Sequence, residues 1–209
     1  MKRKAVQREI TVLKRLNHPG IISLYDLIDT PKQIYIIMDY IKGISLKQYI
    51  KAQNHRAIKV NIARRFFKQI AESMCYLHSL NVVHRDIKLD NILIEEDTKM
   101  VKMIDFGFSV IVNQNRLKIF CGTPNYMSPE IVRRVDYDGK PVDMWALGVL
   151  LYVMLTGTFP FKGTSEQDLF KKIRNGYYNV NHEAIAQSKE IRELLSRLLD
   201  TDHIRRMTA

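Results

Sequence analysis

The feature that most constrains this chain is a pair of polar clusters, His84-Arg85-Asp86-Ile87-Lys88-Leu89-Asp90-Asn91 and, further along, Asp105-Phe106-Gly107. Each cluster stands next to a short run of β-type apolar residues, at 91–94 and 101–104. A charged turn at 95–99 separates the two runs. This pattern places the polar side chains at strand ends or on loops, where they can carry chemistry.

These residue types match what phosphoryl transfer requires. A carboxylate accepts or orients the attacking hydroxyl, a cation offsets charge on the transferring group, and two oxygen ligands hold Mg²⁺. Asp86, Lys88, Asn91 and Asp105 supply that set in sequence order. A single Asp in a loop is more often a turn residue, so the inference depends on the whole pattern.

Three further motifs follow in order: Gly122-Thr123-Pro124-Asn125-Tyr126-Met127-Ser128-Pro129-Glu130, Asp143-Met144-Trp145-Ala146-Leu147-Gly148 and Asp202-His203-Ile204-Arg205-Arg206. With the first two, they make essentially the whole chain resemble a eukaryotic protein kinase catalytic domain. Lys88 resembles the Ser/Thr kinases rather than the Tyr kinases. The stretch 117–129 is similar to the calcium/calmodulin-dependent kinase group, in its AMP-activated and microtubule-affinity-regulating branch. Ser128 and His203 depart from the family's Ala and Pro.

The resemblance implies roles for the catalytic residues and two cofactors, ATP and Mg²⁺. Asp86 would be the catalytic base, Lys88 would contact the γ-phosphate, and Asn91 and Asp105 would bind Mg²⁺. The nucleotide would also be held by further positions. Glu9 would be the helix glutamate that pairs with an ATP-anchoring lysine, Met38 the gatekeeper, and Asp39 and Ile41 part of the hinge. The implied nucleotide-binding set also includes Leu93 and Asp105.

Other residues are implied to organise the activation and substrate segment and the surrounding structure. Thr123 is expected to touch the catalytic loop, and Glu130 to form an ion pair with Arg206. An apolar spine is expected to be anchored on Asp143, although Asp143 could instead cap a helix. The activation-segment residues are Arg85, Phe106, Gly107, Thr123 and Glu130, and the spine residues are Leu13, Leu24, His84 and Phe106.

The hydrophobic spacing and the resemblance together predict an α+β chain of protein-kinase-like fold. A stripe from Val6 to Leu16 predicts a helix over 5–16, and the runs 21–29 and 33–41 predict an antiparallel hairpin. A break at Lys42-Gly43 divides the chain into 1–41, a truncated small lobe, and 42–209, a mostly helical large lobe. The helices expected there carry the stripe 62–77, the apolar stretch 144–155, a segment between Ser165 and Gly176, and a segment after Ser188.

Composition excludes several classes of protein. The net charge is +11, and the two cysteines make neither a disulfide framework nor a C-x-x-C zinc site. The longest apolar stretch, 144–155, is too short to span a bilayer. We expect a cytoplasmic or nuclear location, a protein substrate and a nucleotide as partners, and no membrane partner. The scattered basic residues favour a solvated surface over a nucleic-acid site. The oligomeric state is not predicted.

Two departures from the family pattern concern activity. The only glycine before residue 40 is Gly20, so a Gly-rich loop and a strand lysine for Glu9 are absent from these 209 residues. We therefore expect weak or no transfer by this chain alone, because positioning supplies much of the catalysis. A catalytically silent, pseudokinase-like binding module is the alternative.

Two more departures concern regulation and specificity. Between Gly107 and Thr123 the only Ser or Thr is Ser109, so Arg85 lacks an obvious phosphate partner. We expect activity that is independent of phosphorylation in 116–121. Ser45 stands near the hinge where many relatives carry an acid, which puts a preference for basic substrates in doubt.

Overall fold

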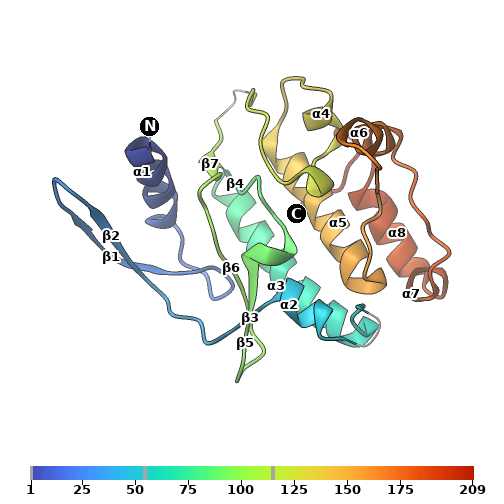
Figure 1. Ribbon diagram of the computed structural model, residues 1–209, viewed down its shortest axis with the longest axis horizontal. Coiled ribbons are helices and arrows are strands. Elements are labelled where there is room, and N and C mark those ends of the chain that lie inside the picture. Colours follow the sequence, from blue (N-terminus) through green and yellow to red (C-terminus); the bar gives the residue numbers. More distant parts are fainter. Residues whose placement is uncertain (1, 54–55, 114–115) are drawn as a thin grey trace.

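The computed structural model describes residues 2–53, 56–113 and 116–209. Figure 1 shows a helix and a β-hairpin on one side, a larger helical part on the other, and a small sheet between them. The first part holds α1 (Lys2–Leu13), β1 (Leu24–Asp29) and β2 (Ile34–Met38). The rest comprises β3 (Gly43–Ser45), α2 (Leu46–Lys51), α3 (Val60–Ser79), β4 (Val82–Val83), η1 (Leu89–Asn91), β5 (Ile92–Glu95), β6 (Val101–Met103), β7 (Val110–Ile111), η2 (Pro124–Tyr126), α4 (Pro129–Val132), α5 (Gly139–Thr156), α6 (Glu166–Asn175), α7 (Glu183–Ala186) and α8 (Lys189–Leu198).

The first helix begins and ends earlier than the hydrophobic stripe predicts. It spans 2–13 rather than 5–16, and the chain then turns through an i→i+3 bond from the Leu16 N–H to the Leu13 carbonyl. Leu16 is still buried, because the turn keeps its side chain against the core. A stripe of apolar residues therefore continues past the end of the helix that carries it.

The predicted hairpin is present and ends in a turn that its polar residues stabilise. β1 and β2 pair antiparallel, with Asp29 opposite Ile34. The Thr30 hydroxyl accepts the Gln33 N–H at 2.9 Å and donates to the Gln33 carbonyl at 2.7 Å. These bonds fix the register, and with it the position of the chain that follows β2.

A three-stranded sheet, in the order β3-β5-β6, joins the two parts. Ile21 forms a parallel bridge with Met103, so the chain before the hairpin is tied to β6. The break predicted at Lys42-Gly43 is instead the start of β3, where Gly43 pairs with Glu95. A Cβ on Gly43 would lie 2.0 Å from the Ile94 carbonyl oxygen, so only glycine fits this close approach. The boundary proposed after residue 41 falls between β2 and β3.

The large helical part has α5 at its centre, and nearly every residue of this helix is buried. A Cβ on Gly148 would meet the Leu198 Cβ at 2.8 Å, so this glycine lets α8 approach closely. The four predicted helices form as α3, α5, α6 and α8, with Ser165 and Ser188 as side-chain N-caps and Gly176 as a C-cap. The fold positions the site by packing α5 against β4 and the loop that follows it.

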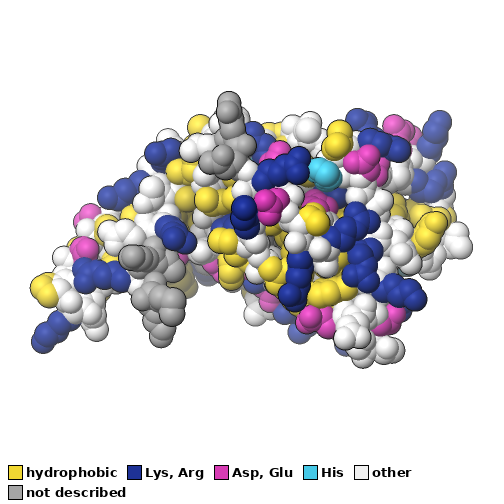
Figure 2. All heavy atoms as spheres, turned by 90° about the horizontal axis from the view of Figure 1, so that it is seen from above, with side chains coloured by type: hydrophobic (Ala, Val, Ile, Leu, Met, Phe, Trp, Pro, Cys, Tyr) yellow, Lys and Arg dark blue, Asp and Glu magenta, His cyan; other side chains and the backbone are white. Residues whose placement is uncertain are grey.

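One face of the molecule shows how its charged side chains are distributed. On the face seen in Figure 2, Lys and Arg side chains are spread among Asp, Glu and uncharged groups. Within residues 2–53, 56–113 and 116–209, the helices are too short or too polar to cross a membrane.

Candidate active site

A buried carboxylate fixes the backbone of the loop between β4 and η1. Asp143, fully buried in α5, accepts the backbone N–H groups of His84 and Arg85, each at 2.8 Å. It also lies 3.1 Å from the Nε2 atom of His78. Arg85 has a φ of +66°, an uncommon conformation for a side-chain-bearing residue. The Asp143 bonds therefore hold a strained loop in place.

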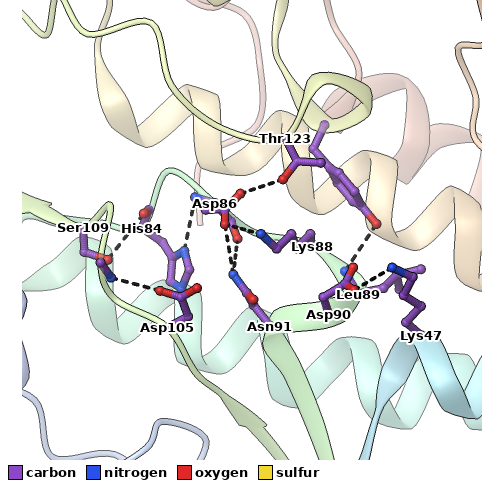
Figure 3. A network of polar contacts seen from close by, with 12 residues as sticks. Lys47, His84, Asp86, Lys88, Leu89, Asp90, Asn91, Asp105, Ser109 and Thr123 are labelled. Carbon is purple, nitrogen blue, oxygen red and sulfur yellow. Dashed lines mark hydrogen bonds and ion pairs between the residues drawn. The ribbon is translucent and has the colours of Figure 1, made fainter.

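The carboxylate of Asp86 is the centre of the site (Figure 3). The Lys88 ammonium donates to its Oδ2 at 2.5 Å, and the Asn91 amide donates to the same oxygen at 3.2 Å. The Thr123 hydroxyl donates to its Oδ1 at 2.9 Å. A carboxylate has about four acceptor positions. Three donors fix Asp86 in orientation and leave one position for a further hydroxyl.

Asn91 and Asp105 offer oxygen atoms beside Asp86. The Asn91 amide nitrogen donates to the Asp86 backbone carbonyl at 3.0 Å, which leaves its side-chain oxygen available. Asp105 is exposed, has a φ of +63° and accepts the Gly107 N–H on Oδ1 at 3.2 Å. In the described part of the chain, no three His, Cys, Asp or Glu side chains gather as a metal site. A hard cation with oxygen ligands fits the Asn91 and Asp105 pair, with further ligands from a bound phosphate and water.

Glu9 on α1 is partly buried and lies near Asp105. Burial and the charge of Asp105 raise the pKa of Glu9, while the backbone N–H of Phe106 lowers it in part. Among the side chains that the structure describes, no Lys or Arg lies within 4.0 Å of this carboxylate. The structure therefore brings Glu9 to the site but shows no cationic partner for it in these residues.

The predicted hinge follows β2, and its first side chain is held in a polar cluster. Asp39 accepts from the Lys102 ammonium at 2.8 Å, from the Ser23 N–H at 3.0 Å and from the Tyr25 hydroxyl. Burial would raise the pKa of Asp39, but these donors outweigh it and hold the pKa well below its usual range. The cluster fixes the backbone between β2 and β3.

The other predicted nucleotide positions are Met38, Ile41 and Leu93. Met38 and Ile41 stand before and after this anchored turn, and Met38 is 37% exposed. Leu93 alternates with the buried Ile92 and Ile94 on β5, so it lies on the opposite, half-buried face of the sheet. Nothing in the geometry tests the assignment of these residues to a nucleotide, and it stays a prediction.

The predicted spine is represented by an aromatic contact. The His84 and Phe106 rings lie 4.9 Å apart at 60°, and both are fully buried. Leu13 is buried and Leu24 packs against the same core. Burial lowers the pKa of His84, although the charges of Asp143 and Asp86 act in the opposite direction. The second polar cluster is thus attached to the first through apolar packing.

The activation segment is docked on the chain before α5. Leu117 and Tyr137 exchange both backbone hydrogen bonds, at 2.8 and 3.0 Å, and the Tyr137 hydroxyl donates to the Ile119 carbonyl at 2.8 Å. Burial and nearby Cys121 raise the pKa of Tyr137 to about 12, although Arg85 lowers it. The Arg85 Nε donates to the Phe108 carbonyl at 2.7 Å. The Arg85 side chain therefore contacts groups of the protein itself, the Phe108 carbonyl and the nearby Tyr137.

The Glu130 and Arg206 side chains form the buried ion pair that the resemblance implies. Two parallel bonds, at 2.6 and 3.0 Å, join the guanidinium to the carboxylate. Arg206 also donates to the carbonyls of Asp200 and Pro141 and lies over the Trp145 ring. The pair joins the end of the activation segment to the chain after α8.

Comparison with known proteins places this geometry in a family. Residues 1–209 match the family described as protein kinase domain. A probable serine/threonine-protein kinase MARK-A from Dictyostelium discoideum is 40% identical over 98% of this chain and 19% of its own length. Sperm motility kinase 3A from Mus musculus is 42% identical over 91% of this chain and 37% of its own. CBL-interacting protein kinase 25 from Oryza sativa subsp. japonica is 36% identical over 97% of this chain and 40% of its own.

The chain belongs to the protein kinase family. Its relatives include named serine/threonine-protein kinases, which confirms the family and the fold class that the five motifs predict. The chain spans about a fifth to two fifths of the length of these curated relatives.

Sequence reasoning missed several residues that shape the site. The Tyr126 hydroxyl accepts the Leu89 N–H at 3.3 Å, and the Lys47 ammonium lies 2.6 Å from Asp90. Tyr126 lies within a motif that was recognised, so its position could have drawn attention. Lys47 gave no local signal, since its partner is distant in sequence. Asp143 does not cap a helix, because Asp138 is the N-cap of α5.

Proposed function

We propose that this chain provides a Ser/Thr protein kinase active site, which transfers the γ-phosphate of ATP to a hydroxyl of a protein substrate. The observation that carries the proposal is the Asp86 carboxylate, held by Lys88, Asn91 and Thr123 with one acceptor position left over. A fixed carboxylate of this kind can orient an acceptor hydroxyl and take its proton.

The neighbouring residues supply the other requirements. Lys88 brings a positive charge to Oδ2 of the same carboxylate, next to the place where charge would develop on a transferring phosphoryl group. Asn91 and Asp105 would hold Mg²⁺, which neutralises phosphate charge when bound. Thr123 joins the substrate segment to Asp86, so the segment and the base are positioned together.

The proposal includes a low rate for these 209 residues by themselves. They contain no Gly-rich loop, and Glu9 has no cationic partner among the described side chains. Fewer groups are then left to position the phosphates, and positioning supplies much of the rate of phosphoryl transfer.

A single-turnover assay tests the proposal. The 209-residue chain is incubated with radiolabelled ATP, Mg²⁺ and a mixture of Ser/Thr acceptor peptides, and phosphoserine and phosphothreonine are measured. Asp86→Asn should lower transfer by about 100-fold or more, because it removes the base. Asp97→Asn, at an exposed turn, is the matched control and should leave transfer unchanged. Equal transfer by the wild type and Asp86→Asn would refute the proposal.

The alternative is a binding module that holds nucleotide without transferring phosphate. Glu9 favours it over catalysis, because its carboxylate lies near that of Asp105 with no lysine beside it among the described side chains, so the phosphates of a bound nucleotide would be poorly positioned for transfer. Equilibrium binding of a fluorescent ATP analogue, with and without Mg²⁺, separates the two. Magnesium-dependent binding that Asp105→Asn weakens, without any transfer in the assay above, would support the binding module.

A further inference from the structure

An ion pair stands on the catalytic loop, on the side away from Asp105. The Lys47 ammonium lies 2.6 Å from Oδ1 of Asp90, which stands between Lys88 and Asn91. Figure 3 shows this pair on the opposite side of Asp86 from Asp105. Both side chains are about half exposed, at 46% and 44%. An acceptor segment that reaches Asp86 from this side would pass over the pair.

The charge of Lys47 is unfavourably placed for its own helix. It lies in the first turn of α2, where a cation opposes the helix dipole. The start of α2 is instead stabilised by a capping box, in which Ser45 accepts the Gln48 N–H and the Gln48 side chain accepts the Ser45 N–H. Ser45 is therefore engaged in capping, and the position of Lys47 is explained by its contact with Asp90.

Two other carboxylates near β2 and β5 also have lysine partners. Asp39 is paired with Lys102 at 2.8 Å, and Glu96 with Lys42 at 3.3 Å. Asp39 follows β2, Glu96 follows β5, and Asp90 lies in η1 just before β5. A basic side chain of a substrate would have to displace a lysine before it could bind any of them. The net charge of +11 further disfavours basic peptides.

From this geometry we infer that Lys47 is a specificity-determining residue, which neutralises Asp90 so that the site does not select substrates with a basic residue there. The inference rests on the proposed function, because it concerns the peptide that this site would bind. The substrate class that it predicts is acceptor segments with uncharged or acidic residues over the Lys47–Asp90 pair. Removal of Lys47 should convert the same position into one that selects Arg.

A positional scan of peptides tests the inference. Each peptide carries one acceptor Ser in an alanine-based sequence, with a single Arg at one of the four positions on either side. Affinity for the 209-residue chain is measured by fluorescence anisotropy at low salt, and transfer is measured separately. The wild type should bind no Arg peptide more than twofold tighter than its alanine counterpart. Lys47→Ala should bind at least one of them about fivefold tighter, which is what an exposed ion pair contributes at most.

Two further variants show whether the effect passes through Asp90. The double variant Lys47→Ala with Asp90→Asn should lose the gained preference. Lys68→Ala is the matched control, because Lys68 is also an exposed lysine paired with an acid, Glu72, but on α3. It should leave every ratio unchanged.

The outcomes separate this inference from the proposed function. Shifted affinity ratios without any phosphate transfer would support the role of Lys47 and refute the kinase activity. A wild type that already prefers Arg through Asp90, ratios that Lys47→Ala leaves unchanged, or no measurable peptide affinity in any variant would each overturn the inference.

Discussion

Asp143 in α5 accepts the backbone N–H of Arg85 at 2.8 Å, across 58 positions of sequence. Its second oxygen accepts the N–H of His84 at the same distance. The bonds go to backbone groups, so they fix the path of the loop whatever its side chains are. Asp86, which follows directly, takes its position from a carboxylate in the centre of the core.

Replacing Asp143 with Asn should destabilise the chain by about 1–3 kcal/mol, because the amide has one oxygen and leaves a buried N–H without an acceptor. Urea unfolding measures the free energy change. Asp97→Asn makes the same chemical change at an exposed turn and should cost little. Equal stabilities of the two variants would show that the Asp143 bonds carry no net free energy.

The sequence predicted the helices well because their signals are local. Ser165, Ser188 and Gly176 stand at helix ends where capping geometry favours them, and the apolar spacing of α3 repeats every three to four residues. The motifs also located the catalytic loop. Neither depends on knowing which distant segments meet.

The remaining features depend on contacts between distant parts of the chain. Gly43 was taken as a break, but pairing with β5 makes it part of a strand. Lys47 meets Asp90 only because α2 lies against η1, and no local pattern marks that contact. Asp143 was left between two roles for the same reason, since its donors lie near residue 84 and on α3.

Tyr137 should hold the activation segment in place without a phosphate. Its hydroxyl donates to the Ile119 carbonyl, and its backbone pairs with Leu117. Tyr137→Phe removes only the hydroxyl, so amide hydrogen exchange in 117–121 should rise several-fold, as for the loss of about 1 kcal/mol. Tyr152→Phe, which removes a similar bond to the Asn179 carbonyl, is the control. Unchanged exchange in 117–121 would assign the order of the segment to other contacts.

His84 should make the chain less stable as the pH falls. Burial lowers its pKa below the ordinary 6.5, so the unfolded chain takes up a proton that the folded chain does not. Stability from this group is complete above pH 6.5 and decreases as the pH falls through that value, by up to about 1.4 kcal/mol per pH unit.

Urea unfolding between pH 7.5 and 5.5 should show a steeper loss for the wild type than for His84→Phe. Burial also lowers the pKa of His18, but this residue is present in both proteins. Parallel slopes would contradict a neutral, buried His84.

The Glu130–Arg206 pair should be the most costly contact to break. Arg206 is buried and forms two bonds with Glu130, so Arg206→Ala leaves a buried carboxylate without a partner. The expected loss is about 3–5 kcal/mol.

The neighbouring Arg205 offers a matched control, because its side chain is 75% exposed and lies 3.5 Å from Asp200. Arg205→Ala should cost about 1 kcal/mol or less. Thermal and urea unfolding of both variants measure the difference. If the two losses were equal, the buried pair would be dispensable, and the end of the activation segment would be held by the packing of α4 against α6 instead.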